Sequence, residues 1–137
     1  TEIEMIEKKH RVEDALEAVK SAQEEGIVRG GGVTLLHCSD FEVEVDNEDQ
    51  RIGAEIIRKS LQSPMRQMAI NAGESPDLII DRVLSSEGLG WNFKTSDLTD
   101  MLEVGIIDPA KVTRVAIQNS VSAASTLITT SNSIIEE

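Results

Sequence analysis

Aromatic side chains are nearly absent from this chain, and their scarcity limits the folds open to it. Only Phe41, Trp91 and Phe93 are aromatic among 137 residues, although 39% of the residues are hydrophobic. Any core must therefore be built from Val, Ile, Leu, Met and Ala, which suits packed helices better than an aromatic-rich β-sandwich. The length suffices for one compact domain or for part of a larger protein. We expect a mainly α fold with a small β element.

The charge and cysteine content exclude several classes of protein. The 25 acidic and 13 basic residues give a net charge of −12, which repels nucleic-acid backbones and anionic membranes, so we expect neither as a partner. Cys38 is the only cysteine, and with His10 and His37 it cannot complete a four-ligand metal site. No apolar run approaches the ~20 residues that span a bilayer. We expect a cytoplasmic location, with the mitochondrial matrix or plastid stroma as alternatives.

The strongest helix pattern runs from Glu7 to Glu25, and Gly26 is typical of its end. Asp14 lies off the apolar stripe of this helix and projects away from its packed face. It is either a solvated surface carboxylate or a group free to meet a ligand. The start at Thr1 rather than at a methionine indicates a processed product or a shortened chain. The stripe consists of Val12, Ala15, Leu16 and Val19.

Three consecutive glycines, Gly30, Gly31 and Gly32, follow the short apolar connector 27–29 and precede an apolar helix start at Val33. Glycines let a backbone approach an anion closely, and the free N–H groups of a following helix can point at a phosphate. The run lacks the lysine and hydroxyl of a Walker A loop. The alternative is a flexible turn between two helices.

The middle of the chain predicts three short helices that form a compact bundle. Residues 47–50 are a plausible capping stretch before the first, Pro64 after Ser63 starts the second, and Ser75 with Pro76 starts the third. Residues 41–45 alternate like a strand beside helical signals, so their assignment stays open. The methionines are expected to fill irregular core space. The expected buried positions of the third helix are Leu78, Ile79 and Val83.

The segment 91–95 gathers aromatic and hydrogen-bonding groups, either as a wall for a base or sugar or as a hairpin whose ring caps the core. The spacing of Leu98, Met101 and Leu102 predicts a helical element that Gly105 closes.

Asp108 and Pro109 then read as the N-cap and first residue of a long last helix. Residues 134–135 are expected to form a short terminal strand. The last helix is marked by Val112, Val115, Ala116, Ala123 and Leu127.

Five stretches in order resemble group I chaperonins, the ring-forming 60 kDa ATPases that help proteins fold. They are EKKHRVEDAL at 7–16, EEGIVRGGGV at 24–33, NEDQ at 47–50, WN at 91–92 and GIIDPAKVTR at 105–114. The resemblance implies that residues 1–25 are a descending intermediate-domain segment. Residues 26–137 are then the C-terminal half of a helical, ATP-binding equatorial domain.

The resemblance also implies the cofactors ATP and Mg²⁺ and a division of labour around them. Asp14 matches the catalytic aspartate that orients or activates the attacking water, and it would share the metal with groups outside this chain. Asp108 matches the carboxylate at the ribose. The remaining implied nucleotide contacts are Gly30, Gly31, Met68, Trp91, Asn92, Phe93, Lys94 and Ile106.

Several features depart from the family pattern. Trp91 stands where Tyr is usual, Phe93 and Lys94 stand where small residues are usual, and Ser75 replaces an acidic residue of the ring-to-ring contact. The phosphate loops, the apical domain and the Gly-Met-rich tail have no counterpart in these residues. The implied partners are other subunits of a homo-oligomeric ring, and co-chaperonin and unfolded polypeptides through the apical domain. We expect no ATP turnover by this chain alone; the alternatives are an oligomerisation module without catalysis and an acidic helical adaptor.

Overall fold

A computed structural model describes residues 1–134 of the chain, which form a mostly helical protein with two small sheets. The expected mainly α fold with a small β element is confirmed. The chain divides into two compact units, which we describe separately. One comprises Thr1–Gly26 and Pro109–Glu137, and the other comprises Ile27–Asp108.

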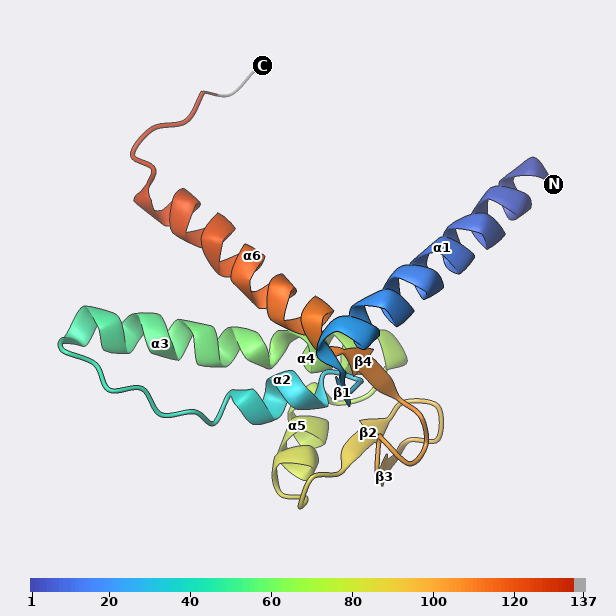
Figure 1. Cartoon of the computed structure of the whole chain (residues 1–137). Helices are drawn as coiled ribbons and strands as arrows, with labels where there is room; N and C mark the ends of the chain where they lie inside the picture. The colour runs from blue at the N-terminus through green and yellow to red at the C-terminus, as the bar shows by residue number, and fades with distance from the viewer. Residues whose placement is uncertain (135–137) are drawn as a thin grey trace. The chain divides into compact units, whose positions relative to one another are not determined.

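The first unit contains the long helices α1 (Glu2–Glu25) and α6 (Ala110–Thr129). They meet where α1 ends and α6 begins, and from there they diverge (Figure 1). Arg114 donates to Glu25 with both Nε (3.0 Å) and Nη2 (2.6 Å), and Lys111 pairs with Glu24. The backbone N–H of Ala110 donates to the carbonyl of Gly26 at 3.1 Å. Ion pairs and one backbone hydrogen bond therefore fasten the two helix ends.

The apolar stripe of α1 is not packed, contrary to the prediction. Val12, Leu16 and Val19 are each more than half exposed. The contacts with α6 lie at the end of α1, so nothing in the described residues covers the stripe. The expected end at Gly26 is confirmed, with φ 82°.

The second unit holds the core, between four short helices and the strands. The helices are α2 (Val33–Cys38), α3 (Glu48–Leu61), α4 (Ser63–Ala72) and α5 (Pro76–Leu84), and the last three are the predicted bundle. Within α5, Ile79 and Val83 are buried as expected, but Leu78 is exposed and Ile80 is buried in its place. The core consists of Val33, Leu36, Met65, Ala69, Ile79, Ile80, Val83, Trp91 and Met101.

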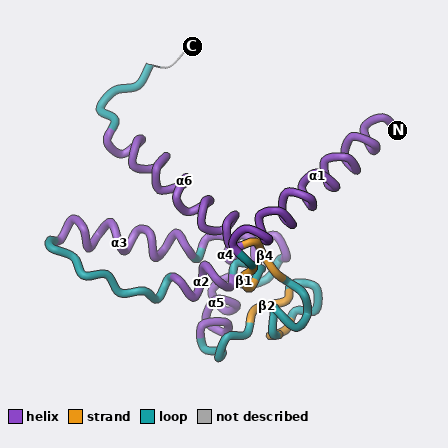
Figure 2. The backbone as a smooth tube through the Cα atoms, in the orientation of Figure 1, coloured by secondary structure: helices purple, strands orange, loops and turns teal. Residues whose placement is uncertain are grey.

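Four strands of three residues each form the two sheets (Figure 2). Strand β1 (Ile27–Arg29), which we expected to be a simple connector, pairs with β4 (Ile107–Pro109). Strands β2 (Gly90–Asn92) and β3 (Asp97–Thr99) form an antiparallel hairpin in which Trp91 faces Leu98. The hairpin interpretation of residues 91–95 is therefore confirmed.

Three other local predictions are wrong or partly outside the described residues. Leu98 lies in β3 and residues 101–105 form turns, so the helical element expected around Leu98, Met101 and Leu102 is not formed. Asp108 lies within β4 and makes no cap, because α6 begins at Ala110 behind Pro109. Ile134 is not in a strand, and residue 135 lies outside the described part of the chain. Residues 41–45 are irregular. No described helix is both long and apolar enough to cross a bilayer.

Candidate functional site

The glycine turn between β1 and α2 reverses the chain with two left-handed residues. Gly31 and Gly32 have φ values of 67° and 75°, which L side chains rarely adopt. The N–H of Val33 donates to the carbonyl of Gly30 at 3.3 Å, and the N–H of Gly30 donates to the carbonyl of Ile106 at 2.9 Å. The turn is thus fixed to the segment that leads into β4.

Each glycine of the turn lies so close to other parts of the unit that an added side chain would force its neighbours to shift. A Cβ on Gly30 would lie 3.0 Å from the carbonyl oxygen of Ile106. On Gly31 it would lie 2.8 Å from Cε of Met101, and on Gly32 it would lie 3.1 Å from Cε of Met68. Close packing at Gly30 and positive φ at Gly31 and Gly32 therefore favour glycine at all three positions.

Four of the residues singled out by the sequence lie in or against this turn: Gly30 and Gly31 belong to it, Ile106 packs on both of them, and Met68 packs on the neighbouring Gly32. Ile106 bonds to Gly30, and its Cγ2 would lie 3.9 Å from a Cβ on Gly31. Met68 and Ile106 both pack on the core as half-buried side chains. The result is a backbone turn beside two aliphatic side chains that remain partly accessible.

The hairpin carries four more of the predicted residues, and the indole ring of Trp91 is buried. The four are Trp91, Asn92, Phe93 and Lys94. Trp91 is only 5% exposed, and its indole Nε1 donates to Oε2 of Glu74 at 2.8 Å. The hydroxyl of Ser96 donates to the other oxygen of Glu74 at 2.7 Å, and the guanidinium of Arg82 lies 5.6 Å from the ring centre. The carboxylate of Glu74 therefore holds both ends of the loop between β2 and β3, through Trp91 and Ser96.

The loop itself presents polar groups. Oδ1 of Asn92 accepts from the N–H of Lys94 at 3.0 Å, and the Asn92 carbonyl accepts from the N–H of Ser96 at 2.8 Å. Phe93 is half-buried against the core, whereas Lys94 is exposed. The backbone of residues 92–96 is therefore held in a single tight turn.

The two acidic residues of the predicted site lie in different units. Asp108, in β4 of the second unit, is half-buried, and burial raises the pKa of its carboxyl. Asp14 lies midway along α1 in the first unit with its side chain exposed. Within residues 1–134 no group of three or more His, Cys, Asp or Glu side chains is arranged to hold a metal ion.

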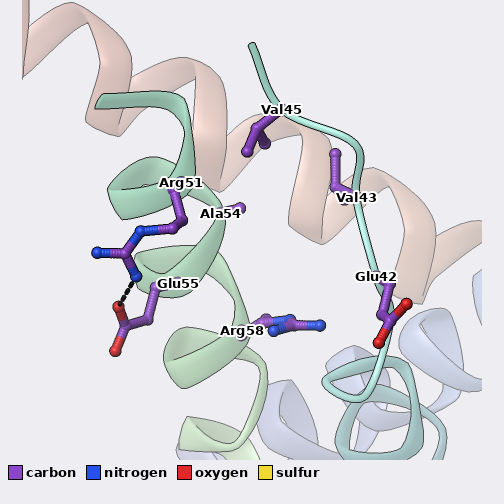
Figure 3. A pocket seen from close by; sticks show the side chains of 7 residues that line it. All are labelled: Glu42, Val43, Val45, Arg51, Ala54, Glu55 and Arg58. Carbon is purple, nitrogen blue, oxygen red and sulfur yellow. Dashed lines mark ion pairs between the residues drawn. The ribbon is translucent and has the colours of Figure 1, made fainter. Parts of the chain in front are cut away.

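Two pockets open in the second unit, and none of the predicted site residues lines either one. The first, of about 480 Å³, lies between α3 and the irregular segment 42–45 (Figure 3). In it Arg51 pairs with Glu55 at 3.8 Å, while Arg58 extends toward that segment and donates to the carbonyl of Phe41. The second, of about 500 Å³, lies among β1, α2 and the end of α5.

Sequence reasoning missed two residues that shape this unit. Glu74 clamps the hairpin, and nothing in its local pattern indicated a distant partner. Gly90 is more constrained still, because a Cβ there would lie 2.5 Å from atoms of both Val33 and Met101. Its position in the break of helical pattern at 87–90 was the available signal.

Comparison with known proteins places this arrangement in a family. A family model of TCP-1/cpn60 chaperonins matches residues 1–137, the whole chain. The chain belongs to the TCP-1/cpn60 chaperonin family. Among solved structures, this chaperonin chain is similar to one described as the crystal structure of a group III chaperonin in the open state. The identity is 28% and the TM-score is 0.72.

That match covers 84% of this chaperonin chain but 25% of the solved chain, so the chain spans about a quarter of that relative. The expected resemblance to chaperonins is confirmed at the level of the family. The assignment to group I and the domain boundaries at residues 25 and 26 stay predictions, as do the roles of the individual site residues.

Proposed function

We propose that this chain supplies part of the ATP-binding domain of an ATP-dependent chaperonin, which assists protein folding as a ring of subunits. The observation that carries the proposal is the packing of the glycine turn 30–32 in a chain that matches the family throughout: Gly30 and Gly31 lie against Ile106, and Gly32 lies against Met68. Their convergence gives a backbone turn and an aliphatic surface of the kind that nucleotide sites use.

The residues fit a nucleotide with Mg²⁺ in part. Gly30 and Gly31 would lie against the phosphates, and Met68 and Ile106 would line the base and sugar. The turn at Asn92–Lys94 would contact the base, and the half-buried Asp108 would accept from the ribose hydroxyls. The buried Trp91 supports the hairpin from beneath.

Asp14 would act on the water that attacks the terminal phosphate and would help to hold Mg²⁺, with the other ligands supplied by groups outside this chain. A bound Mg²⁺ neutralises charge on the phosphates, and a positioned carboxylate orients the nucleophile. Because much of a nucleotide's environment would come from elsewhere, we propose that residues 1–137 alone do not hydrolyse ATP. Steady, Mg²⁺-dependent phosphate release by the chain that disappears in Asp14→Ala would contradict this.

The experiment for nucleotide binding compares two charge-matched variants in the complete protein. Asp108→Asn removes the carboxylate proposed for the ribose, while Asp81→Asn removes an exposed carboxylate on α5 of the same unit. We expect Asp108→Asn to weaken ATP binding about tenfold or more, as the loss of a charged hydrogen-bond acceptor does. Asp81→Asn should bind as wild type. Equal affinities of all three proteins for ATP would refute the assignment.

A second candidate function rests on exposed apolar surface. In the first unit Val12, Leu16, Val19, Leu127 and Ile128 are all exposed, which is typical of surfaces that meet a partner. The chain would then be an oligomerisation module without catalysis. Light scattering separates the two ideas: stable oligomers of the chain that neither bind nor respond to ATP favour the module.

The partners and location follow the first proposal. Other chaperonin subunits would contact this chain, and co-chaperonin and unfolded polypeptides would bind through an apical domain. We propose a cytoplasmic location for the protein, with the mitochondrial matrix or plastid stroma as the alternatives.

A further inference from the structure

A pocket in the second unit, separate from the proposed nucleotide residues, is lined by two side chains that each hold an unpaired nitrogen, Arg29 and His37. It has a volume of about 500 Å³. One side of the pocket is formed by the end of β1 and by α2, and the other side by the end of α5 and the loop after it. Helices α2 and α5 contact each other. The lining residues are Arg29, Thr34, His37, Cys38, Leu84, Ser86 and Gly88.

Two nitrogens in this pocket are buried without a hydrogen-bond partner in the described chain: Nε of Arg29 and Nε2 of His37. Buried polar atoms in native proteins are nearly always satisfied, by protein, by water or by a bound ion. Here the two residues that hold the orphaned atoms line one cavity, although β1 and α2 contribute them separately. One ligand in the cavity would lie next to both side chains.

The residues around Arg29 indicate the charge of that ligand. None of the lining residues is acidic, and no described carboxylate pairs with Arg29, in a chain with 25 acidic and 13 basic residues. By contrast, seven other lysines and arginines are paired with carboxylates. A guanidinium is cationic and matches the geometry of carboxylate and phosphate oxygens.

The remaining polar groups are already engaged. The hydroxyl of Thr34 donates to the carbonyl of Arg29 at 2.8 Å, and that of Ser86 donates to the carbonyl of Val83 at 2.7 Å. Gly88 has φ 82°, and a Cβ there would lie 3.6 Å from Nη2 of Arg29, so the guanidinium rests against the Gly88 backbone. Cys38 is exposed. The guanidinium of Arg29, which is always a donor, therefore has no acceptor in the described chain, and it lines the same pocket as the imidazole of His37.

We propose that this pocket binds a small oxyanion, a phosphate or carboxylate group, between the guanidinium of Arg29 and the imidazole of His37. The volume leaves room for a small organic anion that carries such a group. None of the lining residues belongs to the proposed nucleotide site, so this pocket stands or falls independently of ATP binding.

The test titrates the ¹⁵N-labelled chain with sodium phosphate and, separately, with sodium acetate, at fixed pH and at an ionic strength held constant with chloride. We expect saturable shifts of the amide signals of Arg29, Thr34, His37 and Ser86. Arg29→Gln should weaken binding at least about tenfold, which corresponds to about 1.4 kcal/mol. His37→Gln should weaken it in the same direction, and it decides the matter if Arg29→Gln does not fold.

Arg51→Gln is the matched control, because it removes an arginine from the exposed face of α3 in the same unit. It should bind the anion as wild type does. A response to phosphate alone assigns a phosphoryl ligand, and a response to acetate alone assigns a carboxylate. No saturable shift with either anion, or equal binding by wild type and Arg29→Gln, would overturn the proposal and leave water as the occupant.

Discussion

Replacing Gly90 with alanine adds one methyl group at the glycine with the closest neighbours in the chain's described part. The new Cβ would lie 2.5 Å from Cγ2 of Val33, 2.5 Å from Cγ of Met101 and 2.8 Å from its Sδ. Carbon atoms in contact are normally about 3.5–4.0 Å apart, so the neighbours must move by about 1 Å. Val33 and Met101 are 0% and 1% exposed and have no free space to enter.

Overpacking of this kind typically costs about 1–3 kcal/mol. Two buried neighbours on opposite elements must yield together, so we expect Gly90→Ala to lower the free energy of unfolding by about 2–3 kcal/mol. Gly90 does not have a positive φ, and the effect is therefore steric rather than conformational. Urea denaturation followed by far-UV circular dichroism measures it.

Gly53 provides the control because the same substitution there meets no atom within 4 Å. It lies inside α3 on an exposed turn, where alanine is about 0.8–1.0 kcal/mol more favourable than glycine. Gly53→Ala should therefore stabilise the chain. Opposite signs for the two variants support the packing argument. A change of less than about 0.5 kcal/mol in Gly90→Ala, the range of neutral surface substitutions, would refute it.

Three further predictions concern the candidate site. Glu74→Ala leaves the buried indole N–H of Trp91 without its acceptor and should lower the free energy of unfolding by about 1–3 kcal/mol in urea titrations, with a shift in the tryptophan emission. Gly31→Ala forces a side chain into the left-handed region and toward Cε of Met101, and should cost about 1–2 kcal/mol by the same assay. Burial raises the pKa of Asp108, so its folded form holds a proton more tightly than its unfolded form, and stability falls as the pH rises above the ordinary aspartate value of about 3.9. Asp108→Asn should raise the melting temperature at pH 7, with a gain that vanishes at lower pH; a constant gain at every pH would contradict this.

Local signals in the sequence were sufficient for most of the helices. Asn47 predicted the start of α3, and its side chain accepts from the N–H of Gln50 at 2.9 Å. Ser75 with Pro76 predicted α5, and Gly73 ended α4 in the left-handed conformation. Each of these signals acts within a few residues, so the local sequence is sufficient to predict where these helices begin and end.

Strands β1 and β4 escaped prediction because each is defined by a partner that is distant in the sequence. A run of three residues has no measurable period, and β1 becomes a strand only by pairing with β4 far along the chain. The helical spacing of Leu98 and Met101 was misleading for the same reason, since pairing with Trp91 draws Leu98 into the hairpin. Ile80 is buried instead of Leu78 because the packing of neighbouring helices determines which side of α5 is covered.

The candidate site also has a part that local sequence predicts and a part that only the fold reveals. The glycine run was visible in the sequence, but its contacts with Ile106, Met68 and Met101 depend on the fold of the whole unit. The resemblance to chaperonins grouped these residues where local patterns could not. Neither source pointed to Glu74 or Arg29, whose significance comes from hydrogen bonds made or missing in three dimensions.

We propose that Asp14 is the catalytic carboxylate of a chaperonin ATPase, and the rate of ATP hydrolysis by the complete protein measures its contribution. Asp14→Ala should lower hydrolysis about 10²–10⁴-fold, the usual contribution of a positioned acid or base, while ATP binding is retained. Glu7→Ala, about two turns earlier on the exposed surface of α1, is the control and should hydrolyse ATP at the wild-type rate. Hydrolysis by Asp14→Ala at the wild-type rate, with ATP bound normally, would show that Asp14 is not the catalytic carboxylate.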